Sequence, residues 1–223
     1  MRIAIHQPNF MPWLGYFDRM SRVDRFLVVP DFQFSKGDYH NRTSIKGQQG
    51  AQWLTVPVLH KSGQLIKDVQ LSPGSNWRHK HIKTLSQEYR WAPHFTDLWP
   101  AIVELYRIDS PRIIDFSVRA IINLAHLLDM ESKVALRSIE KCHGDTASRR
   151  LVELCQAEGA DVYVHGPGAA GYMDLDVFQQ AGIQCELHEY VTPEYEQQHQ
   201  AAGFAPGLSV LDALFNIGKL PEG

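Results

Sequence analysis

The chain has 223 residues, of which 44% are hydrophobic and 21% are charged, and its formal net charge is −3. These values are typical of a globular protein, so we expect a single domain over residues 1–223 that needs no disulfide or metal ion to fold. A general nucleic-acid-binding protein needs a basic surface, and the near-neutral balance argues against that class. We therefore expect no nucleic-acid partner.

The charges are distributed unevenly along the chain. Residues 1–112 carry 15 Lys and Arg against 9 Asp and Glu, whereas residues 113–223 carry 7 against 16. A basic N-terminal half favours an anionic small ligand, although chance sorting of surface charges explains the asymmetry equally well.

Cysteine spacing and hydropathy bear on the compartment. The chain shows no Cys-x-x-Cys motif, no signal peptide and no apolar run long enough to cross a bilayer. The pattern predicts a cytoplasmic protein without a membrane span, whose three cysteines are reduced.

The first thirty residues predict a β–turn–α–β unit. Residues 2–6 form an apolar run typical of a buried strand, and Pro8 and Pro12 enforce an extended turn after it. Apolar residues at helical spacing follow over residues 14–20, and residues 26–29 form a second apolar strand. The turn then lies at the carboxyl end of the first strand, where open α/β sheets bind their ligands.

The middle of the chain changes character twice. Residues 32–50 are polar and predict a loop that is too long for an idle connection, and short strands are predicted over residues 52–58 and 67–71. Three helices are then predicted to begin at Asn76, near Pro93 and at Ser110-Pro111. We interpret residues 76–130 as a helical insert or lid.

The last ninety residues return to alternating strands and helices. Strands are predicted over residues 134–136, 162–166 and 183–187, with a helix that Asp145 caps and Gly159 ends. The whole pattern predicts an α/β fold with a Rossmann-like, mainly parallel sheet and a central helical insert.

Polar side chains gather just after the first predicted strand. His6, Gln7 and Asn9 lie in the turn, and Trp13 and Tyr16 follow it. A histidine at this point of a sheet can take a proton or meet an anion, and the two amides offer neutral donors and acceptors. The alternative is a buried histidine with satisfied hydrogen bonds beside a proline-shaped corner.

A second polar cluster follows the second predicted strand and should rise over the same edge of the sheet. It contains Asp31, Gln33, His40, Asn41 and Arg42. Arg42 suits bidentate recognition of phosphate or carboxylate. The alternative is a solvated loop whose Asn and Asp side chains satisfy their own turns.

Two weaker clusters occur further along. Trp77, Lys80 and Lys83 are predicted on one helix, where they form a phosphate clamp or an ordinary solvated face. Gly166 and Tyr172 belong to a glycine-rich turn after a buried strand, which allows a ligand to approach the backbone but lacks the Walker A and dinucleotide-binding spacings. No zinc-spaced Cys and His set is present, so no metal site is expected.

Taken together, the segments resemble the WbqC-like family of bacterial proteins over nearly the whole chain. The resemblance rests on residues 5–18, 31–34, 41–42, 52–58, 159–166, 171–172 and 204–218. Where the usual pattern of the family has Ser or Gly, this chain has His165. Proteins of this family are commonly found among genes for O-antigen and other surface-polysaccharide assembly.

The resemblance implies a transferase that acylates or aminoacylates the amine of a nucleotide-linked sugar. From the residues, His6 is the candidate base, Asp31 would orient it, and His40 is a further catalytic candidate. Asn9 and Asn41 are the candidate neutral donors. The remaining candidates contact substrate: Gln7, Trp13, Tyr16, Gln33, Arg42, Trp77, Lys80, Lys83, Gly166 and Tyr172. No cofactor is required by the sequence, and an acyl carrier protein or a CoA thioester is the candidate donor.

Two alternatives stay open. A histidine-bearing turn between a first strand and a helix resembles nucleotidyltransferases of the HIGH type, but the spacing His-x-Gly-His is absent, because Gln7-Pro8-Asn9 follows His6. The chain is alternatively a non-catalytic protein that binds a sugar nucleotide or a carrier, since aromatic residues such as Tyr39 near the polar loops suit stacking. The acyl donor, the sugar acceptor and the oligomeric state are left open.

Overall fold

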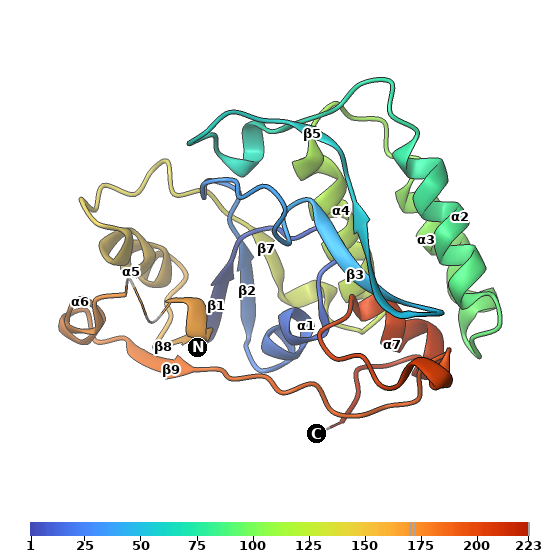
Figure 1. Ribbon diagram of the computed structural model, residues 1–223. Helices are drawn as coiled ribbons and strands as arrows, with labels where there is room; N and C mark the ends of the chain where they lie inside the picture. Colours follow the sequence, from blue (N-terminus) through green and yellow to red (C-terminus); the bar gives the residue numbers. More distant parts are fainter. Residues whose placement is uncertain (170, 172, 223) are drawn as a thin grey trace.

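A computed structural model describes residues 1–169, 171 and 173–222. Its centre is a five-stranded sheet with the order β7-β2-β1-β8-β9, in which every neighbouring pair is parallel. The strands are β1 (Arg2–His6), β2 (Arg25–Val28), β7 (Val134–Leu136), β8 (Val162–His165) and β9 (Gln184–Leu187) (Figure 1). The predicted Rossmann-like α/β fold is confirmed.

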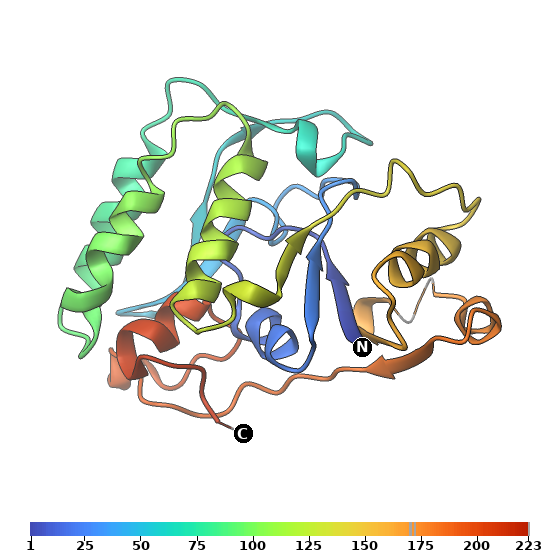
Figure 2. The same ribbon diagram turned by 180° about the vertical axis from the view of Figure 1, so that it is seen from behind.

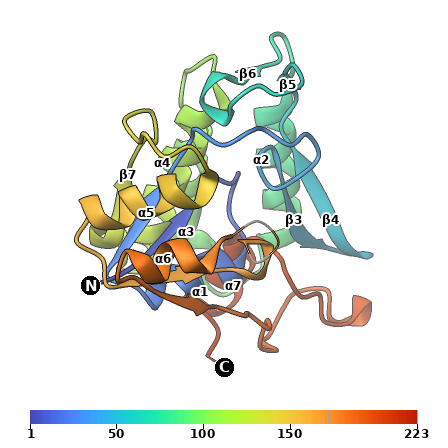
Figure 3. The same cartoon turned by 90° about the vertical axis from the view of Figure 1, so that its left-hand side faces the viewer.

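Helices cover both faces of this sheet. One face packs against α1 (Leu14–Ser21) and α4 (Ile113–His126), and the yellow-green α4 stands beside β7 in Figure 2. The other face packs against α5 (Ala147–Ala157) and α6 (Leu175–Gln180), which face the viewer in Figure 3. The chain winds outward from β1 through β2 to β7, then returns to β8 and continues to β9. The winding direction therefore reverses between β1 and β8, and a crevice opens at such a point beyond the carboxyl ends of the strands.

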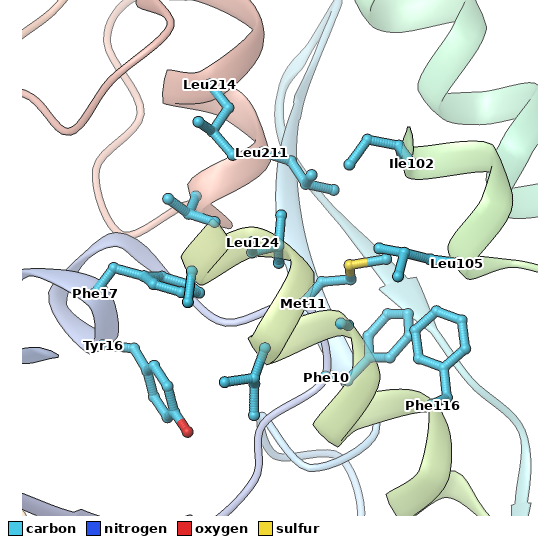
Figure 4. Packing of buried hydrophobic residues seen from close by; sticks show 14 of the residues in the cluster. Phe10, Met11, Tyr16, Phe17, Ile102, Leu105, Phe116, Leu124, Leu211 and Leu214 are labelled. Atoms are coloured by element: carbon cyan, nitrogen blue, oxygen red, sulfur yellow. The ribbon is translucent and has the colours of Figure 1, made fainter. Parts of the chain in front are cut away.

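Strand β1 shows why both faces are covered. Ile3 and Ile5 belong to the hydrophobic cluster under α5 and α6, whereas Ala4 belongs to the cluster under α1 and α4. Because successive side chains of a strand alternate between faces, an apolar strand of this kind is stable only with apolar layers on both sides. In the larger cluster, Phe10, Met11 and Phe116 pack against one another close to Leu105 (Figure 4).

The connection from β2 to β7 contains two hairpins in addition to the predicted helices. It begins with two antiparallel hairpins, formed by β3 (Arg42–Gly47) with β4 (Gly50–Thr55) and by β5 (Val58–Leu59) with β6 (Gln70–Leu71). Helices α2 (Trp77–Tyr89) and α3 (Phe95–Leu105) follow before α4, and α7 (Val210–Ile217) lies near the C-terminus. The short 3₁₀ turns are Ile66–Asp68, Glu131–Lys133, Pro167–Ala169 and Gln200–Ala202.

The prediction of a loop over residues 32–50 was wrong in its second half, where the structure has strand β3. Several of its residues are polar yet buried, and Thr43 and Lys46 find partners in distant parts of the chain. The Lys46 ammonium donates to Oε1 of Gln197 and to the carbonyl of Gly203, while the hydroxyl of Thr43 donates to the carbonyl of Met11 at 2.8 Å. Local polarity therefore concealed a buried strand in which Thr43 and Lys46 find hydrogen-bond partners through tertiary contacts.

Three helices occupy residues 76–130, and they pack into the larger hydrophobic cluster. Helix α4 packs directly on the central sheet, and Trp77 of α2 is buried among Phe10, Tyr106 and Phe116. Helix α4 begins at Ile113 rather than at the predicted Ser110-Pro111. None of the helices formed by the described residues has the length and apolar character that crossing a membrane requires.

Candidate functional site

A cavity of about 500 Å³ lies at the point where the winding of the sheet reverses. His6 ends β1 and Gln7 follows it, while Gly166 and Pro167 follow β8, and all four line the cavity. The other lining residues are Ile5, Asn9, Trp13, Arg19, Phe32, Asp38, Tyr39, Leu151, Tyr163, Gly168, Ala169 and Gly207. The cavity therefore occupies the place where open α/β sheets bind ligands.

His6 is held as a neutral base. Its Nδ1 lies 2.8 Å from the carbonyl oxygen of Gln7, which can only accept, so Nδ1 carries the proton and Nε2 carries the lone pair. Its ring meets Tyr16 edge-on, with the ring centroids 4.7 Å apart. Burial, together with the positive charge of Arg19, lowers the pKa of His6 to about 4. At neutral pH the imidazole is therefore unprotonated and able to accept a proton.

Arg19 brings a buried positive charge into the same cavity. Side chains of a helix lean toward its N-terminus, so Arg19 of α1 reaches back toward the carboxyl edge of the sheet. Only 7% of the residue is exposed, and burial lowers the pKa of its guanidinium, which stays charged at neutral pH. Among the residues that the structure describes, no carboxylate forms an ion pair with it.

Gly166 allows Arg19 to reach this position. A Cβ atom added to Gly166 would lie 2.3 Å from Nη2 of Arg19 and 2.9 Å from its Cζ, so the guanidinium would have to move. The glycine after β8 is therefore required by the close approach of the guanidinium rather than by an unusual backbone angle. The two segments together form one wall of the cavity.

Aromatic and acidic groups form another part of the lining. The rings of Trp13 and Tyr39 stack with their centroids 6.3 Å apart, and Asp38 accepts a hydrogen bond from the Tyr39 amide at 2.7 Å. The cavity thus holds a cation in Arg19, a carboxylate in Asp38 and flat apolar surfaces. This combination suits a ligand with an anionic group, an amine and a ring.

Three buried polar atoms around His6 lack a protein partner within the described part of the chain. They are Oδ1 of Asn9, the hydroxyl of Tyr16 and Nε2 of His40. Buried polar atoms are nearly always hydrogen-bonded, so unpartnered ones mark places where water or a ligand supplies the bond. Asn9 lines the cavity, whereas Tyr16 and His40 lie outside its lining.

The structure thus brings together five of the predicted site residues, namely His6, Gln7, Asn9, Trp13 and Gly166. All five lie at the carboxyl ends of β1 and β8 or in the segments that follow them. The other predicted site residues that the structure describes do not line the cavity.

Asp31 does not orient His6. Its carboxylate accepts from the Lys67 ammonium at 2.8 Å and from the Ile139 amide at 3.0 Å. Burial opposes its ionisation, but these hydrogen bonds outweigh burial and lower the pKa of the carboxyl group. Asp31 therefore ties the end of β2 to the segment after β7, and the predicted pair with His6 is wrong.

The rest of the second predicted cluster also has structural partners. Asn41 accepts from the Gly37 amide at 3.0 Å and donates to the Val56 carbonyl at 2.9 Å, which fixes the turn before β3. Arg42 lies with its guanidinium 4.0 Å from the ring centre of Trp53. Gln33 is exposed on a backbone bridge, and none of Gln33, Asn41 and Arg42 lines the cavity.

The predicted helix cluster is divided between core and solvent. Trp77 is 4% exposed and packs in the larger hydrophobic cluster, whereas Lys80 and Lys83 are exposed on α2 away from the cavity lining. Tyr172 lies outside the described residues. His40 is buried and accepts from the Ser35 amide at 2.9 Å, but it does not line the cavity.

Sequence reasoning missed Arg19 and Asp38. Arg19 lies between the apolar Phe17 and Met20 on a helix that is buried on nearly all sides, so helical spacing does not distinguish it from a solvated arginine. Asp38 lies in the predicted polar loop over residues 32–50, but Asp31 is closer to the end of β2 and was the carboxylate selected as a site candidate. In both cases the missing information was the position of β8 and its glycine turn.

Two further kinds of site come into question elsewhere on the molecule, a second surface hollow and a metal-binding cluster. A hollow of about 700 Å³ runs along residues 59–70, but it is bounded by that one segment and lies away from the strand ends. Among the described residues, no three His, Cys, Asp or Glu side chains gather closely enough to hold a metal ion.

Comparisons with known proteins find sequence matches over nearly the whole chain. A model of the WbqC-like protein family matches residues 7–221. The chain is also 35% identical over 221 residues to the uncharacterized protein Rv1507c of Mycobacterium tuberculosis, an alignment that covers 97% of this chain and 94% of the relative. No solved structure matches the chain. The match spans the strand-end segments that build the cavity as well as the C-terminal helix, and the chain belongs to the WbqC-like protein family.

Proposed function

We propose that this protein is a transferase of bacterial surface-polysaccharide assembly that acylates or aminoacylates the amine of a nucleotide-linked amino sugar. The observation that carries the proposal is the combination of a neutral His6, a buried Arg19 and the carboxylate of Asp38 in one cavity. In a nucleotide-linked amino sugar, the phosphates match Arg19, the ammonium form of the amine matches Asp38, and the proton that the amine loses goes to His6. The family membership supports the pathway, because genes of this family commonly accompany those of surface polysaccharides.

The chemistry follows from the state of His6. The amine of the sugar attacks the carbonyl carbon of an acyl thioester, so a C–N bond forms and the C–S bond breaks. The proton that the amine loses goes to Nε2 of His6, and the thiol leaves with a proton from solvent. Asn9 lies in the same cavity with an unpartnered amide oxygen, and it is the candidate to orient the amine.

The other parts of the ligand find matching surfaces. Asp38 attracts the ammonium form of the amine before it is deprotonated. Trp13 and Tyr39 offer ring faces to the sugar or the base. The donor is an acyl carrier protein or a CoA thioester, and neither Lys80 nor Lys83 lies at the cavity to receive it.

Nucleotidyl transfer is the second candidate, and one observation favours it. The sheet places a histidine between β1 and α1 with a buried arginine behind it, and both groups suit the phosphates of a nucleoside triphosphate. The spacing of the HIGH motif is still absent from residues 6–9.

One experiment separates the candidates. The purified protein is incubated with a set of nucleotide-linked amino sugars and either acyl thioesters or nucleoside triphosphates with Mg²⁺, and the products are followed by mass spectrometry. Acyl transfer increases the mass of the sugar nucleotide and releases a thiol. Nucleotidyl transfer releases pyrophosphate instead. Binding of a sugar nucleotide without either product indicates a non-catalytic binding protein.

A further inference from the structure

Arg19 stands out because no described carboxylate forms an ion pair with its guanidinium. The charge is buried at one wall of the cavity, and the described residues offer it no carboxylate ion pair. Burial of an unpaired charge costs free energy, so such a group is retained where a ligand supplies the opposite charge. In addition, hydrogen bonds to His188 and through it to Asp18 hold the guanidinium in place.

A chain of hydrogen bonds holds the guanidinium from behind. Nε of Arg19 donates to Nδ1 of His188 at 3.3 Å, and Nε2 of His188 lies 2.6 Å from Oδ2 of Asp18. Because an arginine nitrogen only donates, Nδ1 of His188 accepts, and its Nε2 therefore carries the proton that is donated to Asp18. Burial opposes ionisation of Asp18, but the bonds from His188 and Arg22 outweigh it and lower the pKa of that carboxyl group.

This chain leaves the far edge of the guanidinium directed at the glycine turn. Nε is occupied by His188, whereas Nη1 and Nη2 lie where a Cβ on Gly166 would collide with them, at 3.0 and 2.3 Å. The two Nη groups form a fork that matches two oxygen atoms of a phosphate. The fork lies at the reversal point of the sheet, beside Gly166, which has no side chain.

We propose that Arg19 is the receptor for the diphosphate group of the substrate and that His188 is its positioning residue. The assignment rests on the proposed function insofar as the diphosphate belongs to a nucleotide-linked sugar. It predicts affinity for the diphosphate itself, in the absence of any acyl donor. Gly166 is the residue that keeps the receptor open, because any side chain there displaces the guanidinium.

Isothermal titration calorimetry with inorganic pyrophosphate tests the receptor. The wild-type protein is expected to bind pyrophosphate and a nucleoside diphosphate, whereas acetate, which tests a receptor for carboxylates, does not bind. Arg19→Gln is expected to weaken pyrophosphate binding about tenfold or more, because it removes charge-assisted hydrogen bonds. Gly166→Ala retains the charge but moves it, and the same loss is expected. Arg107→Gln, which removes an exposed arginine paired with Glu104, retains wild-type affinity.

The role of His188 has its own pair of variants. His188→Leu removes the acceptor for Nε and is expected to weaken pyrophosphate binding about tenfold. His188→Asn places an amide oxygen near the position of Nδ1 and is expected to restore most of the affinity. Circular dichroism and thermal unfolding establish that each variant is folded.

The proposal is overturned if Gly166→Ala and Arg19→Gln, once folded, bind pyrophosphate as tightly as the wild type. It is also overturned if acetate binds and pyrophosphate does not. Pyrophosphate binding that depends on Arg19, without acyl transfer to any amino sugar, supports the receptor and contradicts the proposed function. If acyl transfer occurs and Arg19→Gln leaves the KM for the nucleotide sugar unchanged, the proposed function is supported and the receptor is contradicted.

Discussion

Two polar regions lie beyond the carboxyl ends of the central strands, and they differ in how their side chains are satisfied. Near the ends of β1 and β8, a cavity is lined by His6, Arg19 and Asn9. Within the described part of the chain, Oδ1 of Asn9 has no hydrogen-bond partner, and Arg19 bonds to His188 through Nε. After β2, Asp31 and Asn41 spend their hydrogen bonds on neighbouring segments. Similar residue types thus build a ligand site in one region and hold loops together in the other. The difference lies in the partners rather than in the residues.

The protonation states follow the same division. Among the described residues no carboxylate pairs with His6, and burial together with the charge of Arg19 lowers its pKa to about 4. The Asp31 carboxylate is buried as well, but Lys67 and the Ile139 amide keep it ionised. Of the two groups, His6 is therefore the neutral base at the cavity, whereas Asp31 is a charged structural contact. Each prediction below breaks or sharpens this contrast.

The largest effect is expected for His6→Gln. Removal of a general base lowers kcat for acyl transfer by about 100- to 10,000-fold. Glutamine retains a polar side chain at the cavity, so binding of the nucleotide sugar should change much less than kcat. The measurement is the initial rate of thiol release, and an unchanged kcat would remove His6 from the mechanism.

Asp31→Ala should act on stability alone. Loss of a buried carboxylate that binds Lys67 and the Ile139 amide is expected to lower the free energy of unfolding by about 2–4 kcal/mol. Urea denaturation measures this loss, and KM stays at its wild-type value. Glu140→Gln is the matched control, because Glu140 pairs with the same lysine from an exposed position and is expected to cost less than about 1 kcal/mol. Equal losses in the two variants would contradict the structural role of Asp31.

Acid should destabilise the protein through its buried histidines. Burial lowers the pKa of His6 and of His81 from 6.5 to about 4, so between these values the unfolded chain binds protons that the folded chain does not. The stabilisation present above pH 6.5 is lost as the pH falls toward 4, by up to about 1.4 kcal/mol per pH unit for each histidine. His81→Phe removes one of the two groups. Urea denaturation between about pH 7 and pH 5 should show a shallower slope for the variant, and an identical slope would falsify the assignment to His81.

The smallest effect is expected for Arg42→Gln. The variant loses a cation–π contact with Trp53, which is worth about 0.5–1 kcal/mol of stability at a site of this kind. Affinity for the nucleotide sugar should not change, because Arg42 lies outside the cavity lining. A marked loss of affinity, measured by calorimetry, would restore the phosphate-binding role that its sequence position suggested.

The comparison of the two regions also shows where prediction from sequence succeeded. The apolar runs at residues 2–6 and 162–166 predicted two central strands, and the turns that follow them supplied His6, Gln7 and Gly166. Prediction failed for Asp31 and Arg42, whose partners Lys67 and Trp53 come from the hairpins of the long connection. It failed for β3 for the same reason, since its Lys46 finds partners in the distant residues Gln197 and Gly203.

The sequence by itself determined the alternation of strands and helices, because hydrophobic periodicity is a local property of the chain. It also determined that polar residues follow the first strand and that glycines follow the strand over residues 162–165. Only the tertiary structure decided that β8 lies beside β1 and that Arg19 reaches Gly166. Arg19 is held by His188, 169 residues away in the chain. Such contacts determine which polar groups remain free for a ligand, and no local pattern of residues encodes them.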